Sequence, residues 1–388
     1  MLLEFGIAAT ALCLLSMRRE SEASERENEN MISDQMAQQM NELFIVTNLK
    51  NSRDEYVKIA DYEKTEMSRL YEVSIPLGLS YTVVAKLHDA LETALKRKVK
   101  VITQDRTAYI KVYDRELPAK LVDIVPNRPA TDDVIIPIGY GWDGVVWWQL
   151  NSDYCHAYIG GGVGSGKSSC THTIITYVTE QYPDIKLLLI DLKRTELGLY
   201  EHMDNVEAYV NQRDEIHALA VRIHDEMIAR YDKMTDVDKI DDYNNLHPND
   251  RMERWIVMFD EVFDFMLLED ETKDLIATIL SKSRACGIHF VFSTQRAVNN
   301  VLPTEITTHL SLRVGFRMNS SQESKNLVED TVLATISKDH KGRGYTNANG
   351  DLEEFQGYFM SREKREAIAK KHQRRMSEET KVKRGWFK

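Results

Sequence analysis

The segment from Gly161 to Ser168 combines residue types that suit phosphate binding. It reads Gly-Gly-Val-Gly-Ser-Gly-Lys-Ser. This matches the phosphate-binding pattern in which four residues separate two glycines and the second glycine is followed by Lys and then by Ser or Thr. Glycines let successive backbone N–H groups turn inward around a phosphate, and the helix that follows adds its positive end. Lys167 would reach the β- and γ-phosphates, and the hydroxyl of Ser168 would bind Mg²⁺. The predicted nucleotide-binding residues are Gly161, Gly162, Val163, Gly164, Ser165, Gly166, Lys167, Ser168 and Ser169.

Two acidic residues that follow an apolar run would complete this site. Residues 255–259 are typical of a buried strand, and Asp260 and Glu261 come directly after them. Asp260 would hold Mg²⁺ through the water shell of the ion, and Glu261 would orient or deprotonate the attacking water. An apolar strand that ends in Asp-Glu is common by itself, so its weight comes from the glycine loop upstream. Together the two segments predict an enzyme that hydrolyses ATP with Mg²⁺ as cofactor.

Gln295 and Arg284 lie on either side of the next apolar run, residues 288–293. Gln295 would lie beside the γ-phosphate and sense hydrolysis through a hydrogen bond, unless it only terminates the strand. Arg284 is expected near the domain surface, where it would complete the site of a neighbouring subunit as an arginine finger. The alternative for Arg284 is a surface arginine with an ordinary acidic partner.

The pattern around these residues predicts an α/β fold. From Tyr154 onward, apolar runs of strand length alternate with helical patterns, which is typical of a mostly parallel sheet covered on both faces. One helix has a clear apolar stripe from Ile216 to Tyr231. The strand-like runs are residues 156–161, 186–191, 255–261, 288–294 and 310–316.

A small α+β domain is expected before the ATPase domain. Its strand-like runs are residues 43–49, 71–77, 99–103 and 108–114. They surround one helical stretch, from Tyr81 to Lys96. The expected parts of the chain are a short membrane anchor (1–19), a polar linker (20–42), the α+β domain (43–121), the ATPase domain (122–360) and a basic tail (361–388). The linker would be a solvated tether or an exposed helix, and the tail an exposed helix or a docking segment for DNA, membrane or a partner.

The N-terminal anchor rests on the apolar run from Phe5 to Met17, which Arg18 and Arg19 follow at once. As a helix this run would span about 20 Å, short of the roughly 30 Å hydrocarbon core of a membrane. One interpretation is an anchor with the two arginines and the ATPase domain on the cytoplasmic side. The alternatives are an amphipathic or buried helix and a signal peptide.

Charge and cysteine content limit the function classes. With 50 Lys and Arg against 61 Asp and Glu, the net charge is −11, which argues against a protein that coats nucleic acid with a basic surface. A ring that touches few phosphates at a time remains compatible with that charge. The four cysteines form no paired spacing, so neither a zinc site nor a disulfide framework is predicted, and a reducing compartment fits.

The segment from about Ile136 to Met360 resembles the motor domain of FtsK/SpoIIIE-type DNA translocases. The departures from the family pattern are Leu192 and Ala297, each where proline is usual. The matching blocks are Ile136 to Trp148, His156 before the loop strand, Asp191-Leu-Lys-Arg-Thr-Glu-Leu197, Asp260-Glu-x-x-Asp264, Ser283-Arg-Ala-Cys-Gly-Ile-His289 and Ser293-Thr-Gln-Arg296.

This resemblance implies a RecA-like P-loop NTPase fold and a motor that assembles as a hexameric ring, with DNA in its channel, ATP sites between subunits and Arg284 acting in trans. The chain lacks the winged-helix domain of chromosomal members, so sequence-directed translocation is not expected. A short FtsK-like protein with a minimal anchor is similar to coupling ATPases of conjugative elements in Gram-positive bacteria. The implied partners are DNA, further copies of the chain, a relaxase and proteins of the conjugation channel.

Other functions remain open at this stage. A soluble motor for plasmid replication, partition or phage packaging would keep the same motifs, and so would an ATPase that exports proteins. A non-hydrolysing scaffold is disfavoured because Lys167, Asp260, Glu261 and Gln295 are all present. DNA contacts could come from Arg296, Lys338, Lys341 and Arg343, although residues 340–344 and the Asn349-Gly350 turn equally predict an ordinary hairpin.

Overall fold

The computed structural model describes residues 34–104, 107–150, 153–297 and 302–374. The chain forms two compact units, which meet in sequence at Leu117 and Pro118. The N-terminal apolar run and the last fourteen residues of the basic tail lie outside the described residues. Within the described ranges, no helix combines the length and the apolar character needed to cross a membrane.

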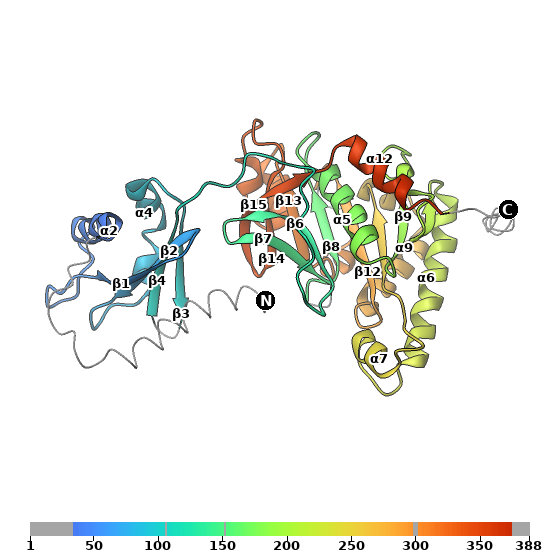
Figure 1. Ribbon diagram of the computed structural model, residues 1–388, viewed down its shortest axis with the longest axis horizontal. Helices are drawn as coiled ribbons and strands as arrows, with labels where there is room; N and C mark the ends of the chain where they lie inside the picture. The colour runs from blue at the N-terminus through green and yellow to red at the C-terminus, as the bar shows by residue number, and fades with distance from the viewer. Residues whose placement is uncertain (1–33, 105–106, 151–152, 298–301, 375–388) are drawn as a thin grey trace. The chain divides into compact units, whose positions relative to one another are not determined.

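The first unit is an antiparallel sheet with helices packed on one face (Figure 1). Its strands pair in the order β1-β2-β4-β3. Helix α2 begins at Gln35 because the side chain of Asp34 accepts hydrogen bonds from the N–H groups of Met36 and Ala37, at 3.0 and 3.1 Å. The elements are α2 (Gln35–Val46), β1 (Lys58–Lys64), β2 (Ser68–Ser74), α3 (Thr82–Ala85), α4 (His88–Leu95), β3 (Val99–Gln104) and β4 (Thr107–Tyr113).

One prediction for this unit was wrong, and another was only partly right. Residues 43–46, predicted to begin a strand, form the last turn of α2, and the helix also takes in residues 35–42 of the predicted linker. The reason is that Ala37, Met40 and Phe44 are buried at helical spacing, so one face of the segment packs on the sheet. The single helix predicted over residues 81–96 is divided into α3 and α4.

The second unit is built on one large sheet. Its strands pair in the order β10-β9-β11-β12-β8-β13-β14-β15-β6-β7, with β5 beside β15. Neighbours from β10 to β13 are parallel, and those from β13 to β7 are antiparallel. The strands are β5 (Leu121–Val122), β6 (Ile135–Gly141), β7 (Gly144–Gln149), β8 (Ala157–Gly160), β9 (Lys186–Ile190), β10 (Val206–Val210), β11 (Trp255–Phe259), β12 (Ile288–Thr294), β13 (Leu312–Phe316), β14 (Arg343–Asn349) and β15 (Asp351–Phe359).

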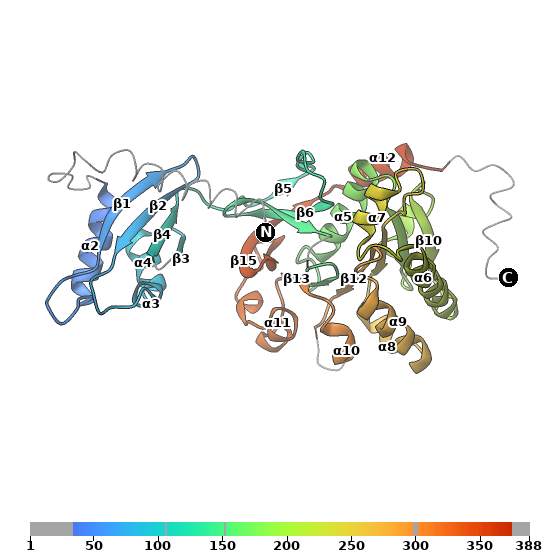
Figure 2. The same ribbon diagram turned by 90° about the horizontal axis from the view of Figure 1, so that it is seen from below.

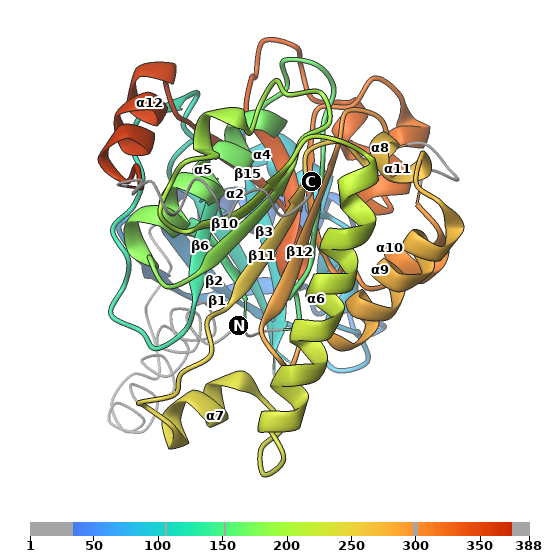
Figure 3. The same ribbon diagram turned by 90° about the vertical axis from the view of Figure 1, so that its right-hand side faces the viewer.

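Helices cover both faces of the parallel part of this sheet. Figures 2 and 3 show α5 and α12 on one side, and α6, α8, α9, α10 and α11 on the other. Alternate residues of each strand serve the two cores, so Leu187 and Leu189 pack with α5, whereas Leu188 and Ile190 pack with α6 and α9. The helices are α5 (Lys167–Gln181), η1 (Gly198–Tyr200), α6 (Asp214–Lys233), α7 (Ile240–Leu246), α8 (Val262–Met266), α9 (Asp270–Lys282), α10 (Thr304–Thr307), α11 (Ser321–Val328), η2 (Val332–Ala334) and α12 (Arg362–Lys371).

Parallel register brings the carboxyl ends of four strands to one edge of the sheet. Thr294 at the end of β12 pairs with Gly160 at the end of β8, and Phe259 at the end of β11 pairs with Phe292 and Ile190. The segments that follow these strands are therefore neighbours in space, as expected where parallel strands of an α/β sheet end. All five strand-like runs predicted for this unit form strands, and the predicted α/β class with a mostly parallel sheet is confirmed.

An aromatic cluster supports the strands that end at this edge. The rings of Phe259 and Phe292 are stacked, with centroids 4.6 Å apart, and Phe265 of α8 meets Phe292 edge-on at 5.9 Å. Phe292 is fully buried. Packing between these rings fixes β11 and β12 relative to each other. The acidic pair follows β11 and Gln295 follows β12, so the same packing fixes the positions of these site residues.

We expect Phe292→Ala to lower the free energy of unfolding of this unit by about 3–5 kcal/mol, because it removes a buried aromatic side chain and leaves a cavity. Chemical denaturation followed by tryptophan fluorescence measures this change. Leu246→Ala is the control, since Leu246 is 64% exposed and its loss should change the free energy by less than about 0.5 kcal/mol. Equal losses in the two variants would contradict the prediction.

Candidate nucleotide-binding site

The glycine loop, residues 161–166, joins β8 to α5 at the carboxyl edge of the large sheet. Gly164 and Gly166 have φ values of 71° and 129°, which residues with a side chain rarely adopt. A Cβ on Gly166 would also lie 2.9 Å from Cα of Gly342. The backbone N–H of Gly342 donates to the carbonyl of Ser165 at 2.8 Å, so the segment before β14 is hydrogen-bonded to the glycine loop.

Lys167, the first residue of α5, is buried at this edge with only 4% exposed. Its ammonium group donates to the hydroxyl of Ser293 at 3.0 Å and to the carbonyl oxygen of Asp260 at 3.3 Å. The carboxylate oxygen Oδ1 of Asp260 lies 3.5 Å from the same nitrogen. The ammonium is thus held in place by groups at the ends of β11 and β12.

Asp260 is a buried carboxylate that lacks full compensation. Burial raises its pKa above the usual range, and the negative charges of Asp191, Glu196 and Glu261 raise it further, against the attraction of Lys167. Oδ1 of Asp260 has no hydrogen-bond partner among the described residues. An oxygen donor in this state suits a divalent cation, which would favour the charged carboxylate.

The residues present fit a Mg²⁺ ion that is shared with a bound phosphate. Among the described residues, no group of three or more His, Cys, Asp or Glu could hold a metal without further ligands. Mg²⁺ commonly takes one or two protein ligands and completes its shell with phosphate oxygens and water. The hydroxyl of Ser168 and the carboxylate of Asp260 are the oxygen donors that the sequence predicted for this ion.

Glu261 follows Asp260 and is also buried, with 4% exposed. Its Oε1 lies 3.1 Å from the hydroxyl of Thr294, and its Oε2 lies 3.3 Å from the ammonium of Lys193. Gln295 comes directly after Thr294 and lines the same cavity as Lys167. The structure therefore brings together the loop, Lys167, the acidic pair and Gln295.

Ser168 is in contact with Glu196, a residue outside the set predicted for the site. The hydroxyl of Ser168 donates to Oε1 of Glu196 at 3.2 Å, and Nε2 of His172 lies 3.2 Å from Oε2 of the same carboxylate. The hydrogen bond from His172 lowers the pKa of Glu196, so this side chain carries its negative charge. The only sequence signal for Glu196 was its place in the block 191–197.

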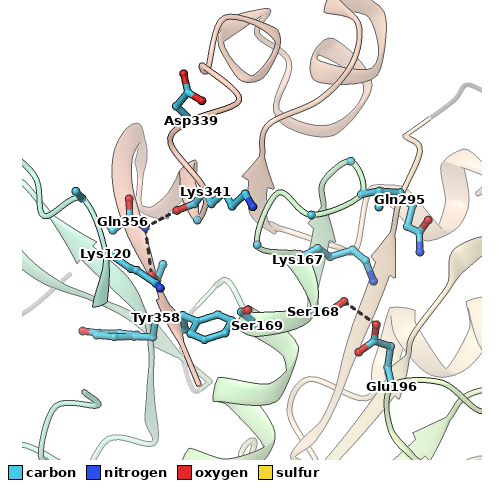
Figure 4. Close-up of a pocket in the computed structure, with 18 residues that line it drawn as sticks. Lys120, Lys167, Ser168, Ser169, Glu196, Gln295, Asp339, Lys341, Gln356 and Tyr358 are labelled. Carbon is cyan, nitrogen blue, oxygen red and sulfur yellow. Dashed lines mark hydrogen bonds between the residues drawn. The ribbon is translucent and has the colours of Figure 1, made fainter. Parts of the chain in front are cut away.

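A cavity of about 610 Å³ adjoins these residues, and its size suits a nucleotide. Figure 4 shows Lys167, Ser168 and Glu196 at one side and Lys120, Gln356 and Tyr358 at the other. Phe359, the last residue of β15, also lines the cavity, and the ammonium of Lys120 lies 5.3 Å from the centre of its ring.

The second wall could not be found from local sequence patterns. β15 and the segment after Pro118 carry no phosphate or metal motif, and only their pairing within the sheet brings them to the glycine loop. Lys341, one of the predicted candidates for DNA contact, also lines this cavity. Gln356 holds that segment in place, because its amide donates to the carbonyl of Lys341 at 2.9 Å.

Arg284 lies apart from this group of residues. It precedes β12, whose seven residues span about 20 Å, so it lies near the amino edge of the sheet, opposite the glycine loop. Its side chain is 51% exposed and pairs with Asp153 at 2.5 Å. In a single chain Arg284 is a surface arginine with an acidic partner, and it does not line the cavity of its own chain.

The other three candidates for DNA contact differ in exposure. Arg296 and Lys338 are exposed. Arg343 is instead held within the β14–β15 hairpin, where it donates to Gln356 at 3.2 Å and to Glu354 at 3.0 Å. The hairpin predicted around residues 340–350 is present, and Arg343 contributes to its packing.

Part of the chain matches a known protein family. Residues 126–299 match the FtsK/SpoIIIE family. The chain is 25% identical over 331 residues to the DNA translocase FtsK of Listeria monocytogenes, an alignment that covers 76% of this chain and 44% of that protein. The chain thus spans less than half the length of this relative.

Two solved structures have a similar fold. The conjugation coupling protein TcpA of pCW3, in its monomer form with ATPγS, is 20% identical with a TM-score of 0.59 over 87% of this chain and 99% of that one. The cytoplasmic domain of the type VII secretion ATPase EccC from Thermomonospora curvata is 22% identical with a TM-score of 0.55 over 65% of this chain and 32% of that one. These likenesses confirm the predicted P-loop NTPase fold.

We expect Asp260→Asn to raise the melting temperature of the nucleotide-free protein at pH 7–8. The pKa of Asp260 is raised in the folded state, so its charge destabilises the fold at any pH above that raised pKa. As the pH falls through the raised pKa, the wild-type carboxyl becomes protonated and the advantage of the variant should disappear. Thermal melting over a pH series measures this, and Mg²⁺-dependent nucleotide binding should be lost in the same variant. A lower melting temperature at pH 8 would show that the attraction to Lys167 outweighs burial.

Proposed function

Since its ATPase domain is of the FtsK/SpoIIIE type, we propose that this protein is an ATP-driven DNA translocase that acts as the coupling ATPase of a conjugative element. The observation that carries the motor assignment is the convergence of the glycine loop, Lys167, Asp260 and Glu261 at one edge of the sheet. Positioning and charge stabilisation are what phosphoryl transfer requires of a protein, and these groups supply both.

In the proposed reaction, the N–H groups of the loop and Lys167 bind the phosphates of ATP. Ser168 and Asp260 hold Mg²⁺, which when bound neutralises charge on the phosphate oxygens. Glu261 orients a water molecule and accepts its proton as the water attacks the γ-phosphorus and the bond to ADP breaks. Gln295 contacts the γ-phosphate and responds to its loss.

The conjugative role is supported by the extent of one structural likeness. The similarity to the conjugation coupling protein TcpA extends over 99% of that chain, whereas similarity to the secretion ATPase EccC covers only 32% of that chain. In this role the ATPase domain works in the cytoplasm, with residues 1–19 as its tether to the membrane. Its partners are DNA, a relaxase and proteins of the transfer channel. Membrane fractionation tests the tether, and recovery in the soluble fraction would favour a soluble plasmid or phage motor.

The position of Arg284 supports a ring in which each ATP site lies between two subunits. This side chain is exposed at the edge opposite its own cavity, so it can reach only the site of another copy. A hexamer that repeats one head-to-tail contact would place every Arg284 beside a neighbour's phosphates. Its guanidinium would then stabilise charge on the transferred group.

We expect DNA to stimulate ATP hydrolysis, because a translocase couples turnover to its track. The rate of phosphate release is measured without DNA, with duplex DNA and with single-stranded DNA. Lys167→Ala should lower the rate at least about 100-fold under all three conditions, since it removes a charged contact to the transferred phosphate. A rate that is high in the wild type but indifferent to both forms of DNA would favour the protein-export alternative.

We also expect two inactive variants to restore activity when mixed. Lys167→Ala and Arg284→Ala should each abolish turnover, but in an equal mixture about one quarter of the sites would have Lys167 from one subunit and Arg284 from the next. Recovery to about that fraction of the wild-type rate supports the trans assignment.

The control for this mixture is Arg222→Ala. Arg222 has a similar exposure, 46%, and a similar acidic partner, Glu207, so its loss should leave the rate nearly unchanged. Absence of recovery, in mixtures that light scattering shows to form mixed rings, would place Arg284 outside the neighbour's site.

A further inference from the structure

The turn of residues 191–197 lies between the metal-binding end and the water-binding end of the site. It leaves β9 at the same edge of the sheet as the acidic pair. Asp191 fixes its shape, because Oδ2 accepts hydrogen bonds from the N–H groups of Glu196 and Leu197 at 3.1 and 2.9 Å. Both backbone groups are thereby satisfied next to the buried strand ends. The turn is a rigid support for the two side chains that it extends towards the site.

Glu196 extends from this turn to Ser168. Its Oε1 accepts the hydroxyl proton of Ser168 at 3.2 Å, which leaves the lone pairs of that oxygen free for a cation. A carboxylate that accepts a proton from a metal ligand fixes the orientation of the ligand and strengthens it as a donor. Glu196 is thus placed to act on the ion through Ser168.

A second set of contacts holds Glu196 from the side away from Ser168. Nε2 of His172 lies 3.2 Å from Oε2, and the hydroxyl of Tyr200 lies 3.0 Å from Nδ1 of His172. Arg365 of α12 also contacts Nε2 of His172. These contacts hold Oε2 of Glu196 while its Oε1 accepts the hydrogen bond from Ser168.

Lys193 extends from the same turn to Glu261. Its ammonium lies 3.3 Å from Oε2, and the hydroxyl of Thr294 lies 3.1 Å from Oε1, so both carboxylate oxygens are held. The side chain of Lys193 is 46% exposed, whereas that of Glu261 is only 4% exposed. A half-exposed lysine adds little to stability, so this pair is better suited to orienting Glu261 than to holding the fold together.

We propose that the turn 191–197 positions both ends of the ATPase site: Glu196 orients Ser168 as a ligand for Mg²⁺, and Lys193 orients Glu261 towards the attacking water. The two residues are positioning residues, because they act through Ser168 and Glu261. This inference rests on the proposed ATPase function. The two residues should have separate effects: Glu196 governs the dependence of nucleotide binding on Mg²⁺, and Lys193 governs the rate of hydrolysis.

The test of Glu196 is equilibrium binding of a fluorescent, non-hydrolysable ATP analogue to the full chain, first in EDTA and then in a MgCl₂ titration. Added Mg²⁺ should strengthen binding of the analogue to the wild type. Glu196→Gln and Glu196→Ala should each raise the Mg²⁺ concentration that gives half of this effect about 10-fold or more, and should leave binding of the analogue in EDTA unchanged. Thr195→Ala, which alters an exposed neighbour on the same turn, is the matched control and should leave both curves unchanged. A merely structural role would weaken binding equally in EDTA and in Mg²⁺, and that result would overturn the proposal.

The test of Lys193 is the turnover number at saturating Mg²⁺ and ATP. Lys193→Met should lower kcat about 10-fold while leaving the binding curves and the melting temperature near those of the wild type, and Lys193→Arg should recover most of the rate because it keeps the charge. An unchanged kcat in Lys193→Met would overturn this half. If the wild type itself neither binds nor hydrolyses ATP, the proposed function fails instead, and the two failures are thereby distinguished.

Discussion

The site depends on two opposite charges that are buried side by side, the ammonium of Lys167 and the carboxylate of Asp260. Removing these charges from water is costly, and their separation of 3.5 Å, with the hydroxyl of Ser293, compensates only part of that cost. Burial accordingly raises the pKa of Asp260, and its Oδ1 has no hydrogen-bond partner among the described residues. The folded chain therefore keeps an attraction for a further cation at Asp260, and Lys167 keeps an attraction for phosphate.

This pair exists only because the strands hold one register. β12 lies between β8 and β11, and the pairings Thr294–Gly160 and Phe292–Phe259 bring the loop and the acidic pair to the same level. A slip of one residue would turn the side chains of a strand to the opposite face and would separate the stacked rings of Phe259 and Phe292. Packing in the two cores thus determines the geometry of the site.

Local signals were sufficient to predict most of this arrangement. The glycine loop and the acids that end an apolar strand each fall within a few consecutive residues, so the phosphate-binding half and five strands of the large sheet could be predicted from the sequence, whereas β10 was missed. The second wall of the cavity could not, because Lys120 and Tyr358 reach it through pairing between strands distant in sequence. The start of the small unit was also misplaced, since a segment rich in polar residues conceals the buried stripe of Ala37, Met40 and Phe44.

The polarity of the parallel sheet has one more consequence. Its strands collect phosphate-binding groups at their carboxyl ends and leave Arg284 near the opposite edge, away from the cavity of its own chain. In the proposed ring, each site would then become competent only when a neighbour docks. An arginine supplied in trans is worth about 10³ to 10⁵ in rate, which is enough to make hydrolysis conditional on the neighbouring subunit. In that ring, the turn 191–197 would orient Ser168 and Glu261 from within the chain, and Arg284 would come from the neighbouring subunit.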